Sequence, residues 1–122
     1  MNAENLRVGG IAATVEFALD AVAMNGRPGY RSGIRPNHWM PGREYTFMGS
    51  LVFADREWLV PGEKCEAKGS FIIPEQDLVS FVPGLTWQVG EGRRIVGSCT
   101  LLAVDGAFEP LPSPRESARP RK

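Results

Sequence analysis

The sequence has few of the side chains that metal sites and nucleophilic active sites require. Its 122 residues include one histidine, His38, and two cysteines, Cys65 and Cys99, which form no CxxC pair. A zinc site takes about four ligands of these types, and a nucleophile needs a positioned base, usually histidine. Phosphate-binding GxxxxGK[ST] and GxGxxG loops are also missing from the sequence. We therefore expect no enzyme, no metal site and no cofactor.

The chain also lacks an excess of one charge and a long apolar run. Fourteen Lys+Arg balance fourteen Asp+Glu, which argues against a polycation acting on nucleic acid or an acidic membrane. No run reaches the roughly 18 apolar residues of a membrane helix, and the first residues lack the profile of a secretory signal. Widely spaced cysteines predict reduced thiols rather than a disulfide framework. We expect a cytoplasmic protein with no membrane partner and no bound nucleotide.

Glycine, proline and alternating hydrophobicity are what the sequence does have. Fourteen Gly and ten Pro, with 43% hydrophobic residues, fit a globular domain of many short strands better than a helical one. Apolar and polar residues alternate with period two, the pattern of strands that are buried on one face. The predicted strands cover residues 11–20, 45–53, 65–73 and 85–89, a final strand at 94–104, and an irregular sixth strand near 37–40.

Pro-Gly pairs separate these runs, because proline presets φ at the first turn position and glycine accepts the positive φ of the second. Residues 90–94 are expected to form the tip of a β-hairpin. We predict an all-β fold, a small six-stranded antiparallel closed barrel, which leaves no exposed strand edges. The expected organisation is an N-terminal extension at 1–7, the barrel at 8–106 and a disordered Pro/Arg-rich tail at 107–122. The Pro-Gly pairs lie at residues 28–29, 41–42, 61–62 and 83–84.

Charge is distributed unevenly along the chain despite the zero total. Residues 24–43 contain Arg27, Arg31, Arg35, Arg43 and His38 with no acid, whereas seven acids fall within residues 44–77. Arginines at four-residue intervals are able to hold phosphate or carboxylate groups through bidentate contacts. The alternative is solvated charge together with internal ion pairs. The sequence leaves both interpretations open.

Three segments resemble a known family when they are taken in order. Residues 27–36, 59–63 and 84–97 are similar to the corresponding segments of the C-terminal, third domain of bacterial translation elongation factor Tu. The resemblance spans roughly residues 12–104, with residues 74–83 as an insertion. It implies a six-stranded antiparallel barrel that is not catalytic. In that family the domain packs against the GTPase domain, touches aminoacyl-tRNA and meets the nucleotide-exchange factor.

The resemblance assigns site residues one by one. Arg35 matches the family's Arg-Pro motif, Glu91, Gly92 and Arg94 match its closing hairpin, and Asn37 stands where the family has a tRNA-facing glutamine. Since the GTPase domain has no counterpart in this chain, GTP hydrolysis is not implied. The complete set of candidate binding residues is Arg27, Arg31, Arg35, Asn37, Glu91, Gly92, Arg93 and Arg94.

Three functions are compatible with these observations. The first is a non-catalytic barrel that binds another protein, for which mixed charge and exposed aromatics such as Trp39 or Trp58 are suited. The second is binding of tRNA or another RNA through the arginines and the basic tail, with an affinity that falls steeply with salt. The third is a regulatory or decoy protein that mimics a surface of the elongation factor.

Overall fold

The computed structural model describes residues 7–22 and 26–112, which form strands, one short 3-10 helix and connecting turns. The elements in chain order are β1 (Val8–Leu19), β2 (Tyr30–Arg31), β3 (Asn37–Trp39), β4 (Thr46–Phe53), β5 (Trp58–Leu59), β6 (Lys64–Pro74), η2 (Glu75–Val79), β7 (Thr86–Glu91), β8 (Arg94–Val104) and β9 (Glu109–Pro110).

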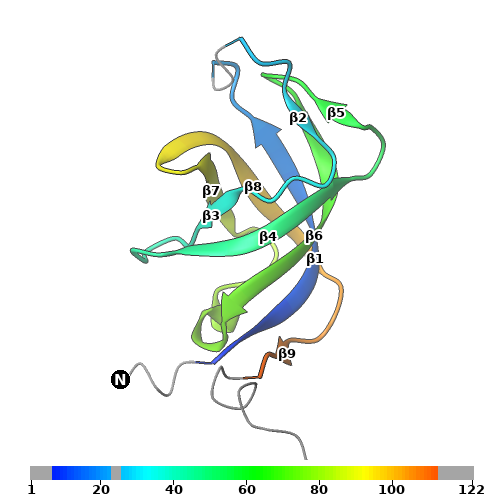
Figure 1. Ribbon diagram of the computed structural model, residues 1–122. Coiled ribbons are helices and arrows are strands. Elements are labelled where there is room, and N and C mark those ends of the chain that lie inside the picture. Colours follow the sequence, from blue (N-terminus) through cyan, green and yellow to red (C-terminus); the bar gives the residue numbers. More distant parts are fainter. Residues whose placement is uncertain (1–6, 23–25, 113–122) are drawn as a thin grey trace, which may run out of the picture.

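Six of these strands close into an antiparallel barrel (Figure 1). The order around the barrel is β6-β4-β3-β7-β8-β1, and β1 pairs with β6 to complete the circle. The β1–β6 ladder runs from Val8↔Pro74 to Ala18↔Lys64 and is the longest in the molecule. The predicted all-β closed barrel of six antiparallel strands is confirmed, and the expected strand at 94–104 coincides with β8.

Alternation of side chains fills the barrel, as the period-two pattern predicts. Successive residues of β4 and β6 alternate between exposed and buried positions along almost their whole length. Two of the inward positions are glycines, Gly49 and Gly69, and a Cβ on either one would overlap the ring of Phe71. These glycines therefore make room for a large aromatic side chain in the core.

The Pro-Gly pairs act as turns, as predicted. The glycines at positions 29, 42, 62 and 84 all have positive φ, and so does Gly92 at the tip of the β7–β8 hairpin, with φ of 56°. Because L-residues with a side chain rarely adopt this conformation, glycine at these positions fixes where each strand ends.

Two small additions extend the barrel. At one end, β2 and β5 form a separate two-stranded ribbon, and β9 lies near the opposite end (Figure 1). The inserted segment 74–83 contains η2, whose buried Asp77 accepts a hydrogen bond from Tyr45 at 2.5 Å and pairs with Arg43 at 3.3 Å. These contacts hold the insertion against the loop between β3 and β4.

The first part of the predicted disordered tail is ordered, which corrects the boundary expected at residue 106. Strand β9 pairs with β1 through Gly9↔Pro110 and Gly10↔Glu109, and Phe108 packs against the core. The missing side chain of Gly9 leaves the space that Phe108 occupies. This close approach of backbone and ring is not visible in composition, which is why composition predicts disorder for this proline-rich segment. Residues 113–122 of that tail, and residues 1–6 of the predicted extension, lie outside the described residues.

No helix among residues 7–22 and 26–112 has the length and apolar character needed to cross a membrane.

Candidate functional site

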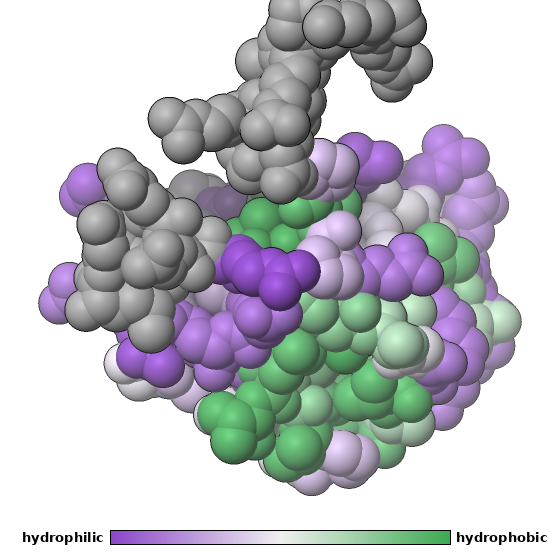
Figure 2. All heavy atoms as spheres, turned by 90° about the horizontal axis from the view of Figure 1, so that it is seen from below, coloured by the Kyte–Doolittle hydropathy of each residue, from purple (hydrophilic) through white to green (hydrophobic). Residues whose placement is uncertain are grey.

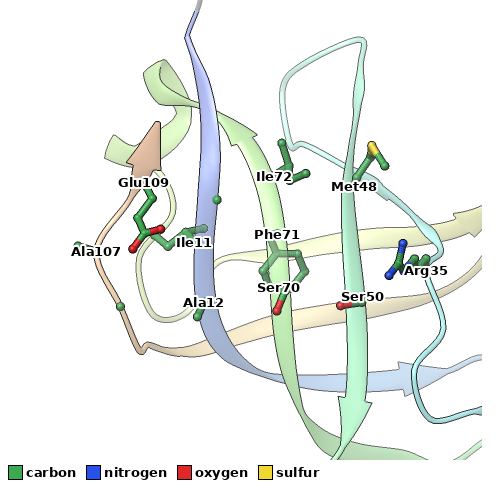
Figure 3. Close-up of a pocket in the computed structure, with 12 residues that line it drawn as sticks. Ile11, Ala12, Arg35, Met48, Ser50, Ser70, Phe71, Ile72, Ala107 and Glu109 are labelled. Carbon is green, nitrogen blue, oxygen red and sulfur yellow. The ribbon is translucent and has the colours of Figure 1, made fainter. Parts of the chain in front are cut away.

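An open groove of about 490 Å³ lies on the outer face of the barrel, across β1, β6 and β4 (Figure 3). The strand register places six outward positions of these strands side by side in two rows. Four of the six positions have small side chains, which leave a hollow in the outer surface of the barrel. The other two positions have large apolar side chains. The rows are Gly10, Ile72 and Met48, and next to it Ala12, Ser70 and Ser50.

The groove has walls of opposite charge. Arg35 lies beyond β4 on one side, and Glu109 lies beyond β1 on the other (Figure 3). Arg35 is held there by the bridge between Ile34 and Leu51 of β4, and Glu109 by the pairing of β9 with β1. Within the described part of the chain, neither Arg35 nor Glu109 forms an ion pair. Both charges are therefore available to a ligand.

The groove also presents exposed apolar surface. Met48 is 66% exposed and Ile72 is 37% exposed, and they lie at outward positions of β4 and β6. Elsewhere on the surface, the view from below shows a further group of apolar side chains with hydrophilic ones around it (Figure 2). Such patches on a small protein mark interaction surfaces more often than isolated exposed residues do.

Two of the predicted binding residues, Arg27 and Glu91, meet next to the tip of the β7–β8 hairpin. The Arg27 guanidinium donates to both carboxylate oxygens of Glu91, at 2.9 and 2.8 Å, and lies over the ring of Tyr30. The Tyr30 hydroxyl also donates to Glu91. The hydrogen bonds from Arg27 and then Tyr30 hold the pKa of Glu91 below its ordinary value, while burial, followed by the contact with Glu91, raises the pKa of Tyr30. This cluster ties the loop before β2 to the hairpin.

Of the other three arginines in residues 24–43, two form ion pairs with described carboxylates and one does not. Arg31 pairs with Glu57, and Arg43 pairs with Asp77. Together with Arg27, three of the four arginines in residues 24–43 thus face carboxylates from the rest of the chain, as in the ion-pair interpretation. Arg35, in the groove, is the exception among the described ion pairs.

The remaining predicted residues lie at the hairpin tip. Asn37 at the start of β3 donates from its side chain to the Gly92 carbonyl at 3.2 Å, so its amide supports the hairpin. Arg93 and Arg94 are exposed beside it. The structure therefore brings Arg27, Asn37, Glu91 and the hairpin together, but it places Arg31 on the β2–β5 ribbon and Arg35 in the groove.

The single histidine is a core residue rather than a surface group. His38 Nδ1 accepts a hydrogen bond from Trp87 Nε1 at 2.9 Å, and its Nε2 lies 3.0 Å from the Gly49 carbonyl, to which it donates. Burial lowers the pKa of His38 to about 4. Its aromatic neighbours are Phe47, Phe71 and Trp87 rather than Trp39, the next residue in the sequence. Adjacent strand residues face opposite sides of the sheet, which explains the difference.

The side-chain hydroxyl of Thr14 lies between two charged groups near the C-terminal end of β8. Thr14 donates to Asp105 at 2.7 Å and accepts from Lys68 Nζ at 2.6 Å. Thr14 is buried next to the register shift in the β1–β8 ladder. Because the Thr14 hydroxyl both donates and accepts a hydrogen bond within the protein, we interpret these three side chains as a structural contact that holds the end of β8 against β1 and β6.

Neither exposed cysteines nor a ligand cluster for metal emerges from the described residues. Cys65 and Cys99 are free and buried, and burial raises the pKa of both thiols. In residues 7–22 and 26–112, His, Cys, Asp and Glu side chains form no group of three that could hold a metal ion. Of the two tryptophans expected at the surface, Trp58 is 45% exposed, while Trp39 is half-buried with its Nε1 unpartnered.

Sequence reasoning missed most of the groove. Met48, Ser50, Ser70 and Glu109 were not among the candidate residues, because each looks like an ordinary outward position of a strand or a tail. The available signal was small or apolar residues at outward positions of three strands, but only the register shows that they are neighbours. No protein-family model matches this chain, and no curated protein matches it.

Proposed function

We propose that this protein is a non-catalytic β-barrel module that binds another protein through the groove across β1, β6 and β4. The observation that carries the proposal is the combination of exposed Met48 and Ile72 with the opposite charges of Arg35 and Glu109, which form no ion pair with the described residues. An apolar centre with a polar, charge-complementary rim is the usual composition of a protein interface.

Pairing of the arginines favours a protein partner over RNA. RNA binding through phosphates requires cationic side chains that are free to displace counterions. Arg27, Arg31 and Arg43 are instead bonded to Glu91, Glu57 and Asp77. At the groove, the carboxylate of Glu109 would repel a phosphate backbone.

The resemblance to the third domain of elongation factor Tu supports the same proposal, because that domain acts by contact with other proteins and has no catalytic role. We propose that this chain is a standalone relative of that barrel. Two free, buried cysteines suit the reducing cytoplasm, where such a partner would be met.

The test is affinity capture of the tagged full chain followed by mass spectrometry, run with and without ribonuclease and at low and moderate salt. We expect the same protein partner under all four conditions. The double variant Arg93→Glu with Arg94→Glu serves as the control, since it removes the exposed hairpin cations but leaves the groove intact. It should retain the partner.

Two results would overturn the proposal. One is capture that disappears with ribonuclease. The other is a gel shift in which tRNA binds the wild type with a steep dependence on salt and fails to bind the hairpin variant, which would assign the protein to RNA binding instead.

A further inference from the structure

The groove is bordered by opposite charges on its two sides, which restricts what can fill it. The backbone of residue 34 lies beside β4, and β9 lies beside β1, so four inter-strand steps separate the two walls. At about 4.8 Å per step, the walls are roughly 19 Å apart. An extended peptide rises about 3.3 Å per residue, so five or six residues cross this span.

We propose that the groove binds an extended segment of the partner that has an acidic residue at one end, apolar residues in the middle and a basic residue at the other end. This inference rests on the proposed function and names the chemistry of the partner. The acidic residue would pair with Arg35 and the basic residue with Glu109, about four to six positions apart. The apolar residues would cover Met48 and Ile72.

Electrostatics selects this order of residues. The guanidinium of Arg35 and the carboxylate of Glu109 stand on opposite walls (Figure 3), so a segment with two like charges would meet one attraction and one repulsion. Opposite charges on the segment satisfy both walls. A bidentate pair with Arg35 also requires a carboxylate rather than a neutral amide for full strength.

The floor adds polar contacts for a peptide backbone. Ser50 and Ser70 are cross-strand neighbours, and neither side-chain hydroxyl bonds to another group in the described residues. Each hydroxyl can donate to a carbonyl and accept from an N–H of a segment lying above it. The small side chains of Gly10 and Ala12 next to them allow the backbone to approach closely.

The experiment uses a random peptide display library selected on the immobilised full chain. We expect enrichment of peptides with an acidic and a basic residue about four to six positions apart, with apolar residues between them. Because a peptide can lie in either direction, both orders of the charges should appear. The selected peptides are then synthesised and titrated against variants.

Charge reversal provides the decisive comparison. Arg35→Glu should weaken the binding of a selected peptide by at least about tenfold. When the acidic residue of that peptide is changed to lysine, the Arg35→Glu variant should bind the changed peptide more tightly than wild type does. Arg93→Glu is the matched control, since it makes the same charge change at an exposed position of the hairpin, and its affinity should stay unchanged.

Blocking the floor gives a second, independent test. Ser70→Trp should fill the groove and abolish peptide binding, while Glu66→Trp, on the same strand and also exposed, should not. The inference is overturned if no peptide class is enriched, or if Arg35→Glu and Ser70→Trp bind the selected peptides as wild type does.

The same variants separate this inference from the proposed function. If the Ser70→Trp variant still captures the wild-type protein partner, the module binds proteins but not through this groove. If the wild type captures no partner and selects no peptide, both the function and the groove are excluded.

Discussion

At the scale of single residues, the interior of the barrel is organised around the imidazole of His38. Its two nitrogens have one partner each, Trp87 Nε1 and the Gly49 carbonyl. This arrangement requires the neutral tautomer with the proton on Nε2. A second proton on Nδ1 would face the indole N–H, so the buried site opposes the charged form in addition to desolvating it.

Acidification should therefore weaken the fold through His38. The pKa of His38 lies at about 4 in the folded protein and near the ordinary value of about 6.5 in the unfolded chain. Between these values the unfolded chain binds a proton that the folded one does not, so stability falls as the pH falls from 6.5 towards 4. From pH 7 to pH 5 the loss amounts to about 2 kcal/mol.

Urea denaturation at several pH values measures this loss, and the variant His38→Gln is the control for carboxylates that titrate in the same range. Wild type should lose about 2 kcal/mol more than the variant between pH 7 and 5. Parallel profiles for the two proteins would show that His38 does not titrate in this way.

The hydrogen bond from Trp87 should contribute measurably to stability. In Trp87→Phe the ring is largely retained, but Nδ1 of His38 loses its donor in a buried site, which costs about 1–3 kcal/mol. Trp58→Phe is the matched control, since Trp58 is 45% exposed and makes no hydrogen bond from its side chain to the described residues. Equal denaturation midpoints for both variants would contradict the expected role of the bond.

At the scale of elements, β9 shows how a short strand depends on one glycine. Gly9 pairs with Pro110, and a Cβ at Gly9 would come within 2.6 Å of Phe108 Cζ. The neighbouring Gly10 has space, since a Cβ added there would lie 3.9 Å from its nearest neighbour, the Phe71 carbonyl oxygen. The absence of a side chain at Gly9 therefore allows β9 to pair with β1, and this pairing places Glu109 at the side of the groove.

Gly9→Ala should detach β9, whereas Gly10→Ala should leave it in place. Hydrogen exchange at the Leu111 amide, which donates to Val8 at 2.9 Å, reports directly on this contact. We expect faster exchange at Leu111 in Gly9→Ala only. Similar exchange in both variants would mean that the clash is relieved without moving β9.

At the scale of the whole molecule, closure of the barrel couples all strands. The β1–β6 ladder joins the first strand to one that begins forty-five residues after β1 ends. The hydrophobic core is one connected cluster built from the other barrel strands, and His38 of β3 packs against its aromatic residues Phe47, Phe71 and Trp87. No strand can leave without opening the ring. A single cooperative unfolding transition is the consequence for a domain of this size.

Leu51→Ala tests this coupling. Leu51 of β4 is fully buried, so truncation should cost about 2–5 kcal/mol through lost transfer energy and a cavity. Far-UV circular dichroism and tryptophan fluorescence should shift to the same new midpoint in urea. Midpoints that separate between the two probes would indicate that part of the barrel unfolds independently.

Local pattern was sufficient for the strands but not for the site. Alternation predicted β4 and β6 almost to the residue, and the Pro-Gly pairs predicted the turns between strands, because both signals act within a few residues of sequence. The arginine-rich loop was recognised as well, but its partners Glu57, Asp77 and Glu91 come from three distant segments. Whether those arginines were free could not be predicted from spacing alone.

The sequence by itself determined that this chain is an all-β barrel, since a period-two pattern punctuated by glycine turns leaves few other ways to bury one face of each strand. The tertiary structure alone decided where charge and apolar surface remain unpaired. Ring closure sets the register of β1, β6 and β4, and the register aligns Ala12, Ser70 and Ser50. Because pairing of charges depends on distances through space, only the folded chain leaves Arg35 and Glu109 facing each other across a groove.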